Sequence, residues 1–420
     1  MKILTLNSHD SVGGAARAAY NLYFGLKELG LDSRMLVSSK ATQDYGVEGP
    51  GTKLGKMRSL LSQHIDDLPK KYFSTLNENL HSPAWFSNIK AEAINEINPD
   101  IIHLHWIQGG GLSVKTISKL NKPIVWTLHD MWAFSGAEHY SNGSLRYKEG
   151  YNKSNRPEGD AGIDLNRWAW KRKKKAWSRI KNLTVVAPSK WMARCAAESV
   201  LFKDRRIEVI PVGLDHNLYR PRDKQTVREI LGMPLDKKII LIGAMNFLKD
   251  KRKGGHYLKK AFELLVKAGC DEKYEVYVLG TTAPLIDQKF GFKTNYYGTN
   301  RDDLSLALLY AAVDVFVAPS IEENFSATVF ESLSCGTPVV AFDIGGMPDM
   351  ITHKQNGYLA KPYLVDDLAA GIKWVLEDPS WPNLAINARK FIENECTLKI
   401  QANRYKRIYD SMIANHLTKI

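Results

Sequence analysis

Two glutamates, Glu323 and Glu331, stand in an E-x7-E spacing where an apolar run gives way to a loop and then to a helical stretch. The spacing predicts that Glu323 lies in the loop and Glu331 about two turns into the helix, on the same side. Carboxylates accept paired hydrogen bonds from vicinal hydroxyls, such as those of a sugar ring or ribose, and amides at a helix start favour phosphate. The pattern therefore indicates a sugar or nucleotide site, although acidic residues are also common near helix N-termini for reasons of helix stability alone.

A second candidate is the cationic run from Lys249 to Lys253, which includes Arg252 and leads into Gly254-Gly255 and another expected helix. A cation near a helix N-terminus opposes the helix dipole, so a bound anion explains it better than helix stability does. A diphosphate would satisfy both the cations and the helix. A solvated charge run is the alternative, and it is the commoner fate of such stretches.

Chemistry-bearing residues in the first half are a glycine pair and three histidines. Gly13-Gly14 follows the first apolar run and precedes a helical stretch, where the backbone could approach an anionic group. A tight turn without a ligand explains the pair equally well, and the G-x-G-x-x-G fingerprint is absent. His129 ends a buried-type strand, a position that favours a functional role over that of a core histidine. His103 and His105 alternate on another strand, where packing and hydrogen bonding are expected first.

The segment from Trp168 to Trp177 reads as a basic helix with three tryptophans. Such a helix could touch an anionic membrane surface. A solvated basic face with the tryptophans in the core is the favoured interpretation, because charge runs usually face water.

Apolar runs and helix-length segments alternate along the chain. The expected strands are residues 2–7, 33–37, 100–105, 123–129, 183–187, 207–210, 238–243, 274–280, 314–318 and 338–342. The expected helices are residues 15–29, 112–120, 165–179, 256–268, 327–335, 365–376, 382–394 and 398–413, and residues 41–87 are assigned loops and short helices. This alternation predicts parallel sheets with right-handed crossovers, whose ligands bind at the carboxyl ends of the strands.

Breakers between Pro211 and Pro221 mark a linker, so the prediction is an α/β protein of two Rossmann-like domains. Their expected bounds are 1–211 and 212–397, facing each other across a cleft, with the last helix, 398–420, packing back on the first domain. A length of 420 residues agrees with two domains.

Composition narrows the class of partner. The formal net charge of +13 favours anionic partners, and nucleic acid, lipid surfaces and phosphorylated small molecules all fit it. The four cysteines are far apart, which favours a reducing compartment. The N-terminus does not resemble a signal peptide, and no apolar run reaches the length of a membrane span. We expect a cytoplasmic protein, either soluble or peripheral at the inner face of the cell membrane.

Taken together, these segments resemble the retaining glycosyltransferases of the GT-B fold, the large family that includes sucrose and mannosyl transferases. Among them, the sequence is most similar to bacterial exopolysaccharide enzymes of the colanic-acid type. The order and spacing of the shared segments, over nearly the whole chain, make the resemblance specific. The shared segments are Gly13–Ala15, Asp100–Trp106, Thr127–Trp132, Ile210–Asp215, Arg252–Gly254 and Glu323 to Val340.

The resemblance implies a role for each candidate residue. Lys253 would contact the donor diphosphate, Glu331 would bind the ribose, and Glu323 would hold the transferred sugar. His129 would reach the same sugar from the other domain, and Gly14 would bring its backbone N–H toward phosphate. The remaining implied contacts are Asn324, Phe325, Ser326 and Ala327 for the sugar and its phosphate, Arg252 or Lys249 for a further phosphate contact, and Asp10 and Arg17 on the acceptor side.

The implied reaction moves a sugar from a nucleotide-diphosphate donor to a saccharide or lipid-linked saccharide, without a metal or a cofactor. Cations and helix N-termini would stabilise the leaving group. The sequence departs from the family at Gly243-Ala244, where relatives typically carry an arginine, and it has Asn324 and Ser326 where many have glycines. Residues 136–157 contain no cysteine, although close relatives have cysteines there, so neither a metal nor a disulfide is expected.

Two alternatives are weighed against this interpretation. A sugar-nucleotide epimerase also uses two Rossmann domains, but it lacks the combination of a Lys-Gly segment with E-x7-E. A basic nucleic-acid-binding protein fits the charge, but the cations are dispersed and no nucleic-acid module is recognised. We therefore expect nucleotide sugar, and no nucleic acid, among the partners.

Overall fold

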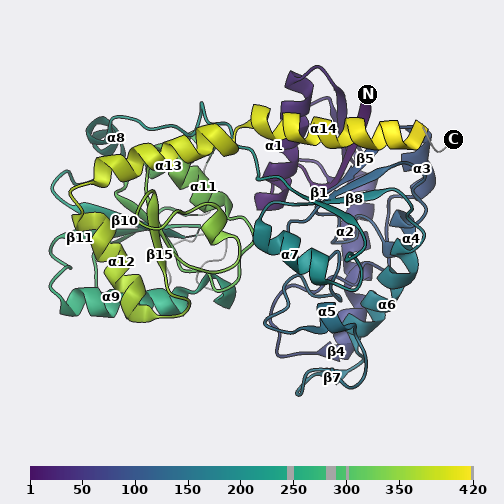
Figure 1. The fold of residues 1–420 in the computed structure, drawn as a ribbon, viewed down its shortest axis with the longest axis horizontal. Coiled ribbons are helices and arrows are strands. Elements are labelled where there is room, and N and C mark those ends of the chain that lie inside the picture. The colour runs from purple at the N-terminus through teal and green to yellow at the C-terminus, as the bar shows by residue number, and fades with distance from the viewer. Residues whose placement is uncertain (244–249, 281–289, 299–301, 418–420) are drawn as a thin grey trace. The chain divides into compact units, whose positions relative to one another are not determined.

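The chain folds into two compact units, each built around a parallel sheet (Figure 1). The computed structural model describes residues 1–243, 250–280, 290–298 and 302–417. Unit 1 comprises Met1–Gly213 and Leu398–Ile420, and unit 2 comprises Leu214–Thr397. The expected boundary lay after residue 211, and residues 398–420 were expected with the first domain. The predicted cleft between the domains stays a prediction.

Unit 1 contains a seven-stranded sheet in the order β3-β2-β1-β5-β6-β8-β9, with every neighbouring pair parallel. Its strands are β1 (Lys2–His9), β2 (Asp32–Ser39), β3 (Val47–Glu48), β5 (Ile101–Leu104), β6 (Ile124–Thr127), β8 (Leu183–Ala187) and β9 (Arg206–Val209). The strand order reverses between β1 and β5. In a doubly wound sheet, the loops after two such strands diverge and leave room for a ligand.

The helices of unit 1 cover both faces of this sheet because β1 alternates apolar side chains between the faces. They are α1 (Gly14–Glu28), α2 (Lys53–Asp67), η1 (Leu68–Tyr72), α3 (Ala91–Glu96), α4 (Val114–Ile117), α5 (Arg146–Glu149), α6 (Leu165–Trp177), α7 (Lys190–Glu198) and α14 (Leu398–Leu417). Ile3 packs under α1 and α14, whereas Leu4 and Leu6 join the larger core on the other face. A small antiparallel pair, β4 (Phe73–Ser74) with β7 (Ala161–Gly162), lies apart from the main sheet.

Unit 2 contains a six-stranded sheet in the order β12-β11-β10-β13-β14-β15, again entirely parallel. Its strands are β10 (Lys238–Gly243), β11 (Tyr274–Leu279), β12 (Thr294–Tyr296), β13 (Val315–Ala318), β14 (Val339–Phe342) and β15 (Gly357–Ala360). Its helices are α8 (Lys224–Leu231), η2 (Lys251–Lys253), α9 (Gly255–Lys267), α10 (Asp303–Ala312), α11 (Ala327–Ser334), η3 (Met347–Asp349), α12 (Val365–Glu377) and α13 (Trp381–Glu395). The strand order reverses between β10 and β13.

Two parallel α/β units are confirmed, with several differences in detail. The expected helix at 112–120 shrinks to α4, which Ser113 caps by accepting a hydrogen bond from the Thr116 N–H. The segment assigned to loops and short helices contains the 15-residue α2. Strands β12 and β15 and helices α8 and α10 were not predicted, because short edge strands and helices of only eight to ten residues leave a weak pattern.

Candidate functional site

In unit 2, the two loops at the switch point of the sheet bring together a lysine and a glutamate. Lys253 ends η2 in the loop after β10, and Glu323 lies in the loop after β13, the neighbouring strand. Lys253 Nζ donates a hydrogen bond to Glu323 Oε2 at 2.6 Å. Arg252 Nη1 lies 3.7 Å from the same oxygen and donates to the Glu322 carbonyl at 3.1 Å. The structure thus places three predicted site residues in one ionic cluster.

Burial and charge act against each other on Glu323, which is only 6% exposed. Burial by itself raises the pKa of this carboxyl. Lys253 and Arg252 nevertheless hold the pKa of Glu323 below its usual range, with help from the Asn324 backbone N–H. The carboxylate is therefore ionised at neutral pH and can accept hydrogen bonds from hydroxyl groups.

Glycines let the backbones of these loops approach closely. Gly254 has φ of 71°, and a Cβ there would lie 1.8 Å from the Pro319 carbonyl oxygen. Gly345 has φ of 54°, and its Cβ would lie 2.0 Å from the Glu323 carbonyl oxygen, which also accepts from the Gly346 N–H at 3.0 Å. Backbone packing therefore fixes the position of Glu323, and no side chain larger than hydrogen fits at either glycine.

Helix α11 begins directly after this loop. Its N-cap residue, Ser326, makes no capping hydrogen bond through its own side chain. The dipole and amides of such a helix start attract an anion. Asn324 and Ser326 are buried beside it, and the Phe325 ring lies 5.5 Å from that of Phe330.

Glu331 lies deeper in the unit than predicted. It is the fifth residue of α11, just over one turn from the start, so the expectation of about two turns was wrong, although the helix begins at residue 327 as expected. Its side chain is buried, and Oε2 accepts a hydrogen bond from the Tyr310 hydroxyl at 3.1 Å. The sequence analysis did not single out Tyr310.

The other cation proposed for phosphate, Lys249, lies outside the described residues, as does Ala244. The role of Lys249 stays a prediction. The guanidinium of Arg252 already makes hydrogen bonds within the protein, because Nη2 donates to Asp250 Oδ2 at 3.0 Å and Nη1 donates to the Glu322 carbonyl.

In unit 1, His129 follows β6 and belongs to a row of histidines. His129 Nε2 lies 2.9 Å from His105 Nδ1, and the rings of His105 and His103 are 4.3 Å apart. His103 Nδ1 lies 2.7 Å from the Tyr409 hydroxyl, and His103 Nε2 lies 2.8 Å from the Thr127 hydroxyl. His103 and His105 are buried, as expected, whereas His129 is partly exposed. A row of hydrogen bonds and one ring contact, between His103 and His105, therefore runs from α14 through the sheet to His129.

The row is uncharged at neutral pH. Burial lowers the pKa of His129 to about 4, although Asp130 opposes this shift. Burial, with a smaller effect of His129, lowers the pKa of His103 to about 3, and the pKa of His105 also lies well below its usual range. A neutral His129 can donate or accept a hydrogen bond but offers no positive charge.

Asp130, next to His129, is held by residues that sequence reasoning missed. Asp130 Oδ2 lies 2.6 Å from His139 Nδ1 and accepts from Trp106 Nε1 at 3.1 Å. His139 Nε2 lies 2.8 Å from Ser82 Oγ. Ser82 and His139 are both buried, so this serine–histidine–aspartate arrangement fixes the loop after β6. The only sequence signal for this arrangement was the position of Asp130 beside His129.

The glycine loop of unit 1 leads into α1. Gly13 is the N-cap of α1, with φ of 89° and no capping side chain, and Gly14 is exposed. Both carboxylate oxygens of Asp10 accept hydrogen bonds from residues 41 and 42, and the side chain is buried. Asp10 therefore anchors the chain after β2, and its expected contact with an acceptor has no support in these bonds. Arg17 is partly exposed on α1, and its role stays a prediction.

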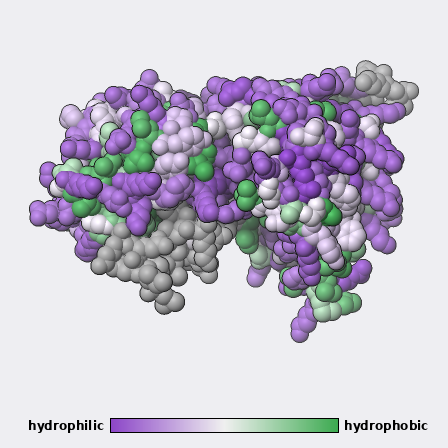
Figure 2. Space-filling view, turned by 90° about the horizontal axis from the view of Figure 1, so that it is seen from below, coloured by the Kyte–Doolittle hydropathy of each residue, from purple (hydrophilic) through white to green (hydrophobic). Residues whose placement is uncertain are grey.

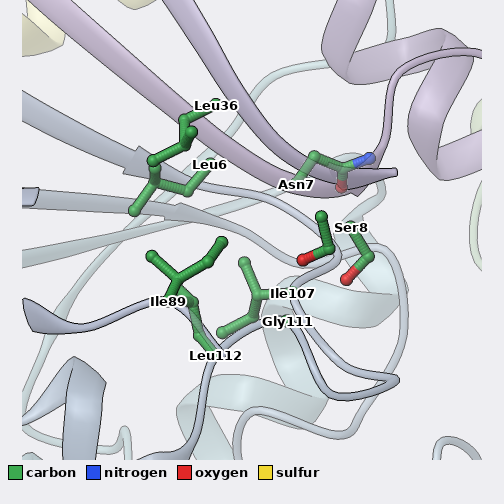
Figure 3. A pocket seen from close by; sticks show the side chains of 9 residues that line it. Leu6, Asn7, Ser8, Leu36, Ile89, Ile107, Gly111 and Leu112 are labelled. Atoms are coloured by element: carbon green, nitrogen blue, oxygen red, sulfur yellow. The ribbon is translucent and has the colours of Figure 1, made fainter. Parts of the chain in front are cut away.

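A small pocket lies at the carboxyl ends of β1 and β2 in unit 1, beside the loop after β5 (Figure 3). Its lining is Leu6, Asn7, Ser8, Leu36, Ser38, Ile89, Ile107, Gly111 and Leu112. It has room for about one water molecule. The pocket is too small for a sugar or a nucleotide.

The tryptophan helix α6 is a core element, as favoured from the sequence. Trp170 and Trp177 are buried, and Lys173 is fully buried with them. Lys173 Nζ donates to the carbonyls of Trp132, Ser135 and Gly136 and lies 3.6 Å from the centre of the Trp132 ring.

In the segment 136–157, Glu138 accepts a hydrogen bond from the Tyr151 hydroxyl. All four cysteines of the chain are buried, and none of them forms a disulfide. Among the residues that the structure describes, no group of three or more histidine, cysteine, aspartate or glutamate side chains could hold a metal ion. The expected independence of metal and cofactor stays a prediction.

Each half of the chain matches a family model. Residues 12–218 match Glycosyltransferase Family 4, and residues 223–395 match Glycosyl transferases group 1. The two matched ranges correspond closely to the two Rossmann-like units. Together, the matches and the fold indicate a glycosyltransferase of the GT-B fold. The second unit is thus similar to the group 1 glycosyltransferases and the first unit to Glycosyltransferase Family 4, so each unit matches a glycosyltransferase family.

The matched relatives include D-inositol 3-phosphate glycosyltransferases. The one from Mycobacterium marinum is 27% identical over 50% of this chain and 45% of its own length, so the match spans less than half of that relative. The one from Nocardiopsis dassonvillei is 26% identical over 73% of this chain and 69% of its own length.

Solved structures share the fold. Sucrose-phosphate synthase from Thermosynechococcus elongatus has a TM-score of 0.68 and 19% identity, covering 99% of this chain and 100% of that chain. HepE from Anabaena, in complex with UDP and glucose, has a TM-score of 0.63 and 18% identity, covering 98% and 100%. At this level of identity, the likeness shows the fold alone.

Proposed function

We propose that the protein is a retaining glycosyltransferase that moves a hexose from a nucleoside-diphosphate sugar to a saccharide or lipid-linked saccharide, without a metal. The observation that carries the proposal is the Lys253–Glu323 pair at the switch point of unit 2, beside the start of α11. A parallel sheet binds its ligand at such a switch point. An ammonium, an ionised carboxylate and a helix start are the groups that a sugar diphosphate requires.

In this proposal, Lys253 turns toward the donor diphosphate when the donor binds and stabilises the negative charge that develops on the leaving group. Glu323 is then released from part of its ion pair and accepts hydrogen bonds from sugar hydroxyls. Asn324 to Ala327 supply amides to the sugar and its phosphate, and Glu331 accepts from the ribose.

Neutral His129 and the exposed backbone at Gly14 are the groups that unit 1 offers. A histidine held in one orientation by His105 can bond a hydroxyl without adding a charge. The assignment of His129 and Gly14 to the donor rests on the family resemblance.

The acceptor and the cellular role are likewise proposed from the family resemblance. A role in surface-polysaccharide synthesis in the cytoplasm, at the inner face of the membrane, agrees with the net charge of +13. Inositol phosphate is a second candidate acceptor, which the printed names of the matched relatives support. Among the described residues, no helix has the length and apolar character of a membrane span.

The first experiment is a thermal-shift screen with UDP, GDP and ADP and their glucose or mannose conjugates, with and without EDTA. A ligand that binds only the folded state raises the melting temperature by mass action. We expect a shift from one nucleotide class, unaffected by EDTA and lost in Glu331→Ala. No shift from any nucleotide sugar would contradict the proposal, and a shift abolished by EDTA would contradict metal independence.

The second experiment follows the reaction by NMR with the nucleotide sugar identified in this way. The anomeric configuration of the product distinguishes retention from inversion. Conversion of the nucleotide sugar into its epimer, without any acceptor, would instead support an epimerase.

A further inference from the structure

Helix α2 is amphipathic with its polar face turned inward. Apart from the partly buried Ile65, the residues that face the body of unit 1 are small or polar: Gly55, Ser59, Ser62 and Asp66. Ser59 Oγ donates to the Ser38 carbonyl at 2.7 Å, and Ser62 Oγ donates to the Gly110 carbonyl at 2.6 Å. Hydrogen bonds and a close backbone approach therefore hold α2 in place, instead of the apolar packing that usually docks a surface helix.

The buried carboxylate of Asp66 anchors the C-terminal end of α2 through hydrogen bonds. Asp66 Oδ1 accepts from the backbone N–H groups of Trp85 and Phe86 at 2.8 and 3.0 Å, and Oδ2 accepts from Ala84 N–H at 3.2 Å. This anchoring fixes the rotation of α2 about its axis, and with it the face that points to solvent.

The outward face of α2 carries the large apolar side chains. Its residues recur at helical spacing and are each between 42% and 62% exposed: Leu54, Met57, Leu60, Leu61 and Leu68, the last beginning η1. Tyr72, the last residue of η1, is also exposed, as are Leu76 and Leu80 in the chain after it. Figure 2 views the molecule from below. Its right half, which unit 1 occupies, shows hydrophobic surface among hydrophilic surface. An exposed apolar surface of this length is typical of an interaction site.

Cations border the apolar face. Lys53, Lys56 and Arg58 are exposed along α2, and Lys70 and Lys71 follow in η1. Of the two acidic residues in this stretch, Asp66 is buried and Asp67 is paired with Lys70 at 2.7 Å. The face that remains is apolar and positively charged.

We propose that α2 and η1 form a membrane-docking surface for a bilayer that contains anionic phospholipids. The leucines and Met57 would enter the boundary between headgroups and acyl chains, and the flanking cations would contact lipid phosphates. A helix of this length lies about 22 Å along the surface. Charge complementarity selects this occupant, because a second copy of a chain with net charge +13 would bring like charges together.

This surface differs from the tryptophan helix considered from the sequence. Two of the three tryptophans of α6 are buried and hold that helix in the core, so α6 presents a basic face with little apolar surface. The α2 surface combines both features that interfacial binding needs. The inference does not depend on transferase activity, because binding can be measured without substrates.

The test is vesicle co-sedimentation of the full chain with phosphatidylcholine vesicles and with phosphatidylcholine–phosphatidylglycerol vesicles at 70:30. We expect binding to the anionic vesicles only, weakened by added salt. Leu54→Gln/Leu61→Gln should reduce the partition coefficient roughly tenfold or more. The matched control is Ile230→Gln/Ile386→Gln, which removes two similarly exposed isoleucines from helices of unit 2 and should bind as the wild type does.

A second pair of variants tests the charges. Lys53→Gln/Lys56→Gln should weaken binding about 25-fold, or about fivefold per cation. Lys171→Gln/Lys175→Gln on α6 should leave binding unchanged. Circular-dichroism melting confirms that each variant is folded. Wild-type protein that binds neither vesicle, or α2 variants that bind normally, would overturn the proposal, as would a dimer in solution that the α2 variants dissociate.

Discussion

The ammonium of Lys253 lies 2.6 Å from the carboxylate of Glu323, although 70 positions separate the two residues in the chain. The pair exists because β10 and β13 are neighbours in the sheet, so that the loops after them meet. Both side chains are largely buried, and Arg252 supports the carboxylate from 3.7 Å. The candidate donor site is therefore also a buried ionic element of unit 2.

A double-mutant cycle measures this coupling. Lys253→Met leaves Glu323 buried with only Arg252 as a cationic neighbour, so we expect a loss of about 2–4 kcal/mol in the free energy of unfolding. Lys253→Met/Glu323→Gln should recover at least half of that loss, because no lone buried charge remains. Urea denaturation of the four proteins gives the coupling energy.

The control for this cycle is the exposed pair Lys406–Asp410, 2.7 Å apart, whose coupling should stay below about 1 kcal/mol. Equal coupling in the two pairs would contradict a buried ionic element. All three variants at Lys253 and Glu323 should lose transfer activity, whereas restored stability with full activity would remove these residues from the proposed mechanism.

Gly254 should tolerate no side chain. Gly254→Ala forces a Cβ to within 1.8 Å of the Pro319 carbonyl and must move the loop that carries Glu323, so we expect both destabilisation above about 2 kcal/mol and loss of the nucleotide-induced thermal shift. Gly232→Ala is the matched control, because Gly232 has a similar φ of 65° with no atom near its Cβ position. It should cost about 1 kcal/mol and retain nucleotide binding. Comparable losses of stability and nucleotide binding in the two variants would show that the close contact between Gly254 and Pro319 does not position the site.

The histidine row predicts a dependence of stability on pH. The folded-state pKa values of His103 and His129 are about 3 and about 4, below the ordinary value, so the unfolded chain takes up more protons as pH falls below 6.5. Stability is therefore fully present above pH 6.5 and is lost as pH falls through the folded-state values. Each histidine contributes up to about 1.4 kcal/mol per pH unit in this window.

Urea unfolding at pH 7, 6 and 5 measures the slope. His129→Asn should reduce it by about one histidine's contribution, whereas His64→Asn, at an exposed position on α2, should leave it unchanged. A slope that His129→Asn does not alter would show that this histidine is not held neutral by the fold.

Lys173 should be essential to unit 1 for a structural reason. Lys173→Met leaves the carbonyls of Trp132, Ser135 and Gly136 without their donor and removes the ammonium from the Trp132 ring, so we expect a loss of about 2–4 kcal/mol. Lys171→Met, at an exposed position of the same helix, should change stability by less than about 0.5 kcal/mol. Equal melting temperatures for the two variants would contradict the buried role of Lys173.

Much of the fold could be predicted because it depends on local pattern. The buried strands, such as β10 and β13, are short apolar runs bounded by polar residues or breakers, and α1 and α9 show clear helical periodicity. Edge strand β15 carries a glycine and only two buried residues, too weak a pattern to recognise. Helix α2 was missed although its apolar residues recur at helical spacing, because Gly55, Ser59 and Ser62 lower its helix propensity.

The site could be predicted in part. Parallel sheets place ligands after their strands, so Lys253, Glu323 and His129 could be singled out from their positions. The residues that hydrogen-bond the site side chains from distant segments could not be predicted. Tyr310 reaches Glu331, and Tyr409 reaches His103 across 306 positions, only after the helices have packed.

The sequence by itself thus determined the α/β alternation, the two-domain organisation and the loops in which chemistry should occur, because hydrophobic periodicity and breakers act over a few residues. Only the tertiary structure decided that Lys253 meets Glu323, that α6 buries Lys173 and that α2 turns its leucines to solvent. The physical reason is that strand order and helix rotation are set by the sum of many contacts between distant segments, and no short stretch of sequence contains that sum.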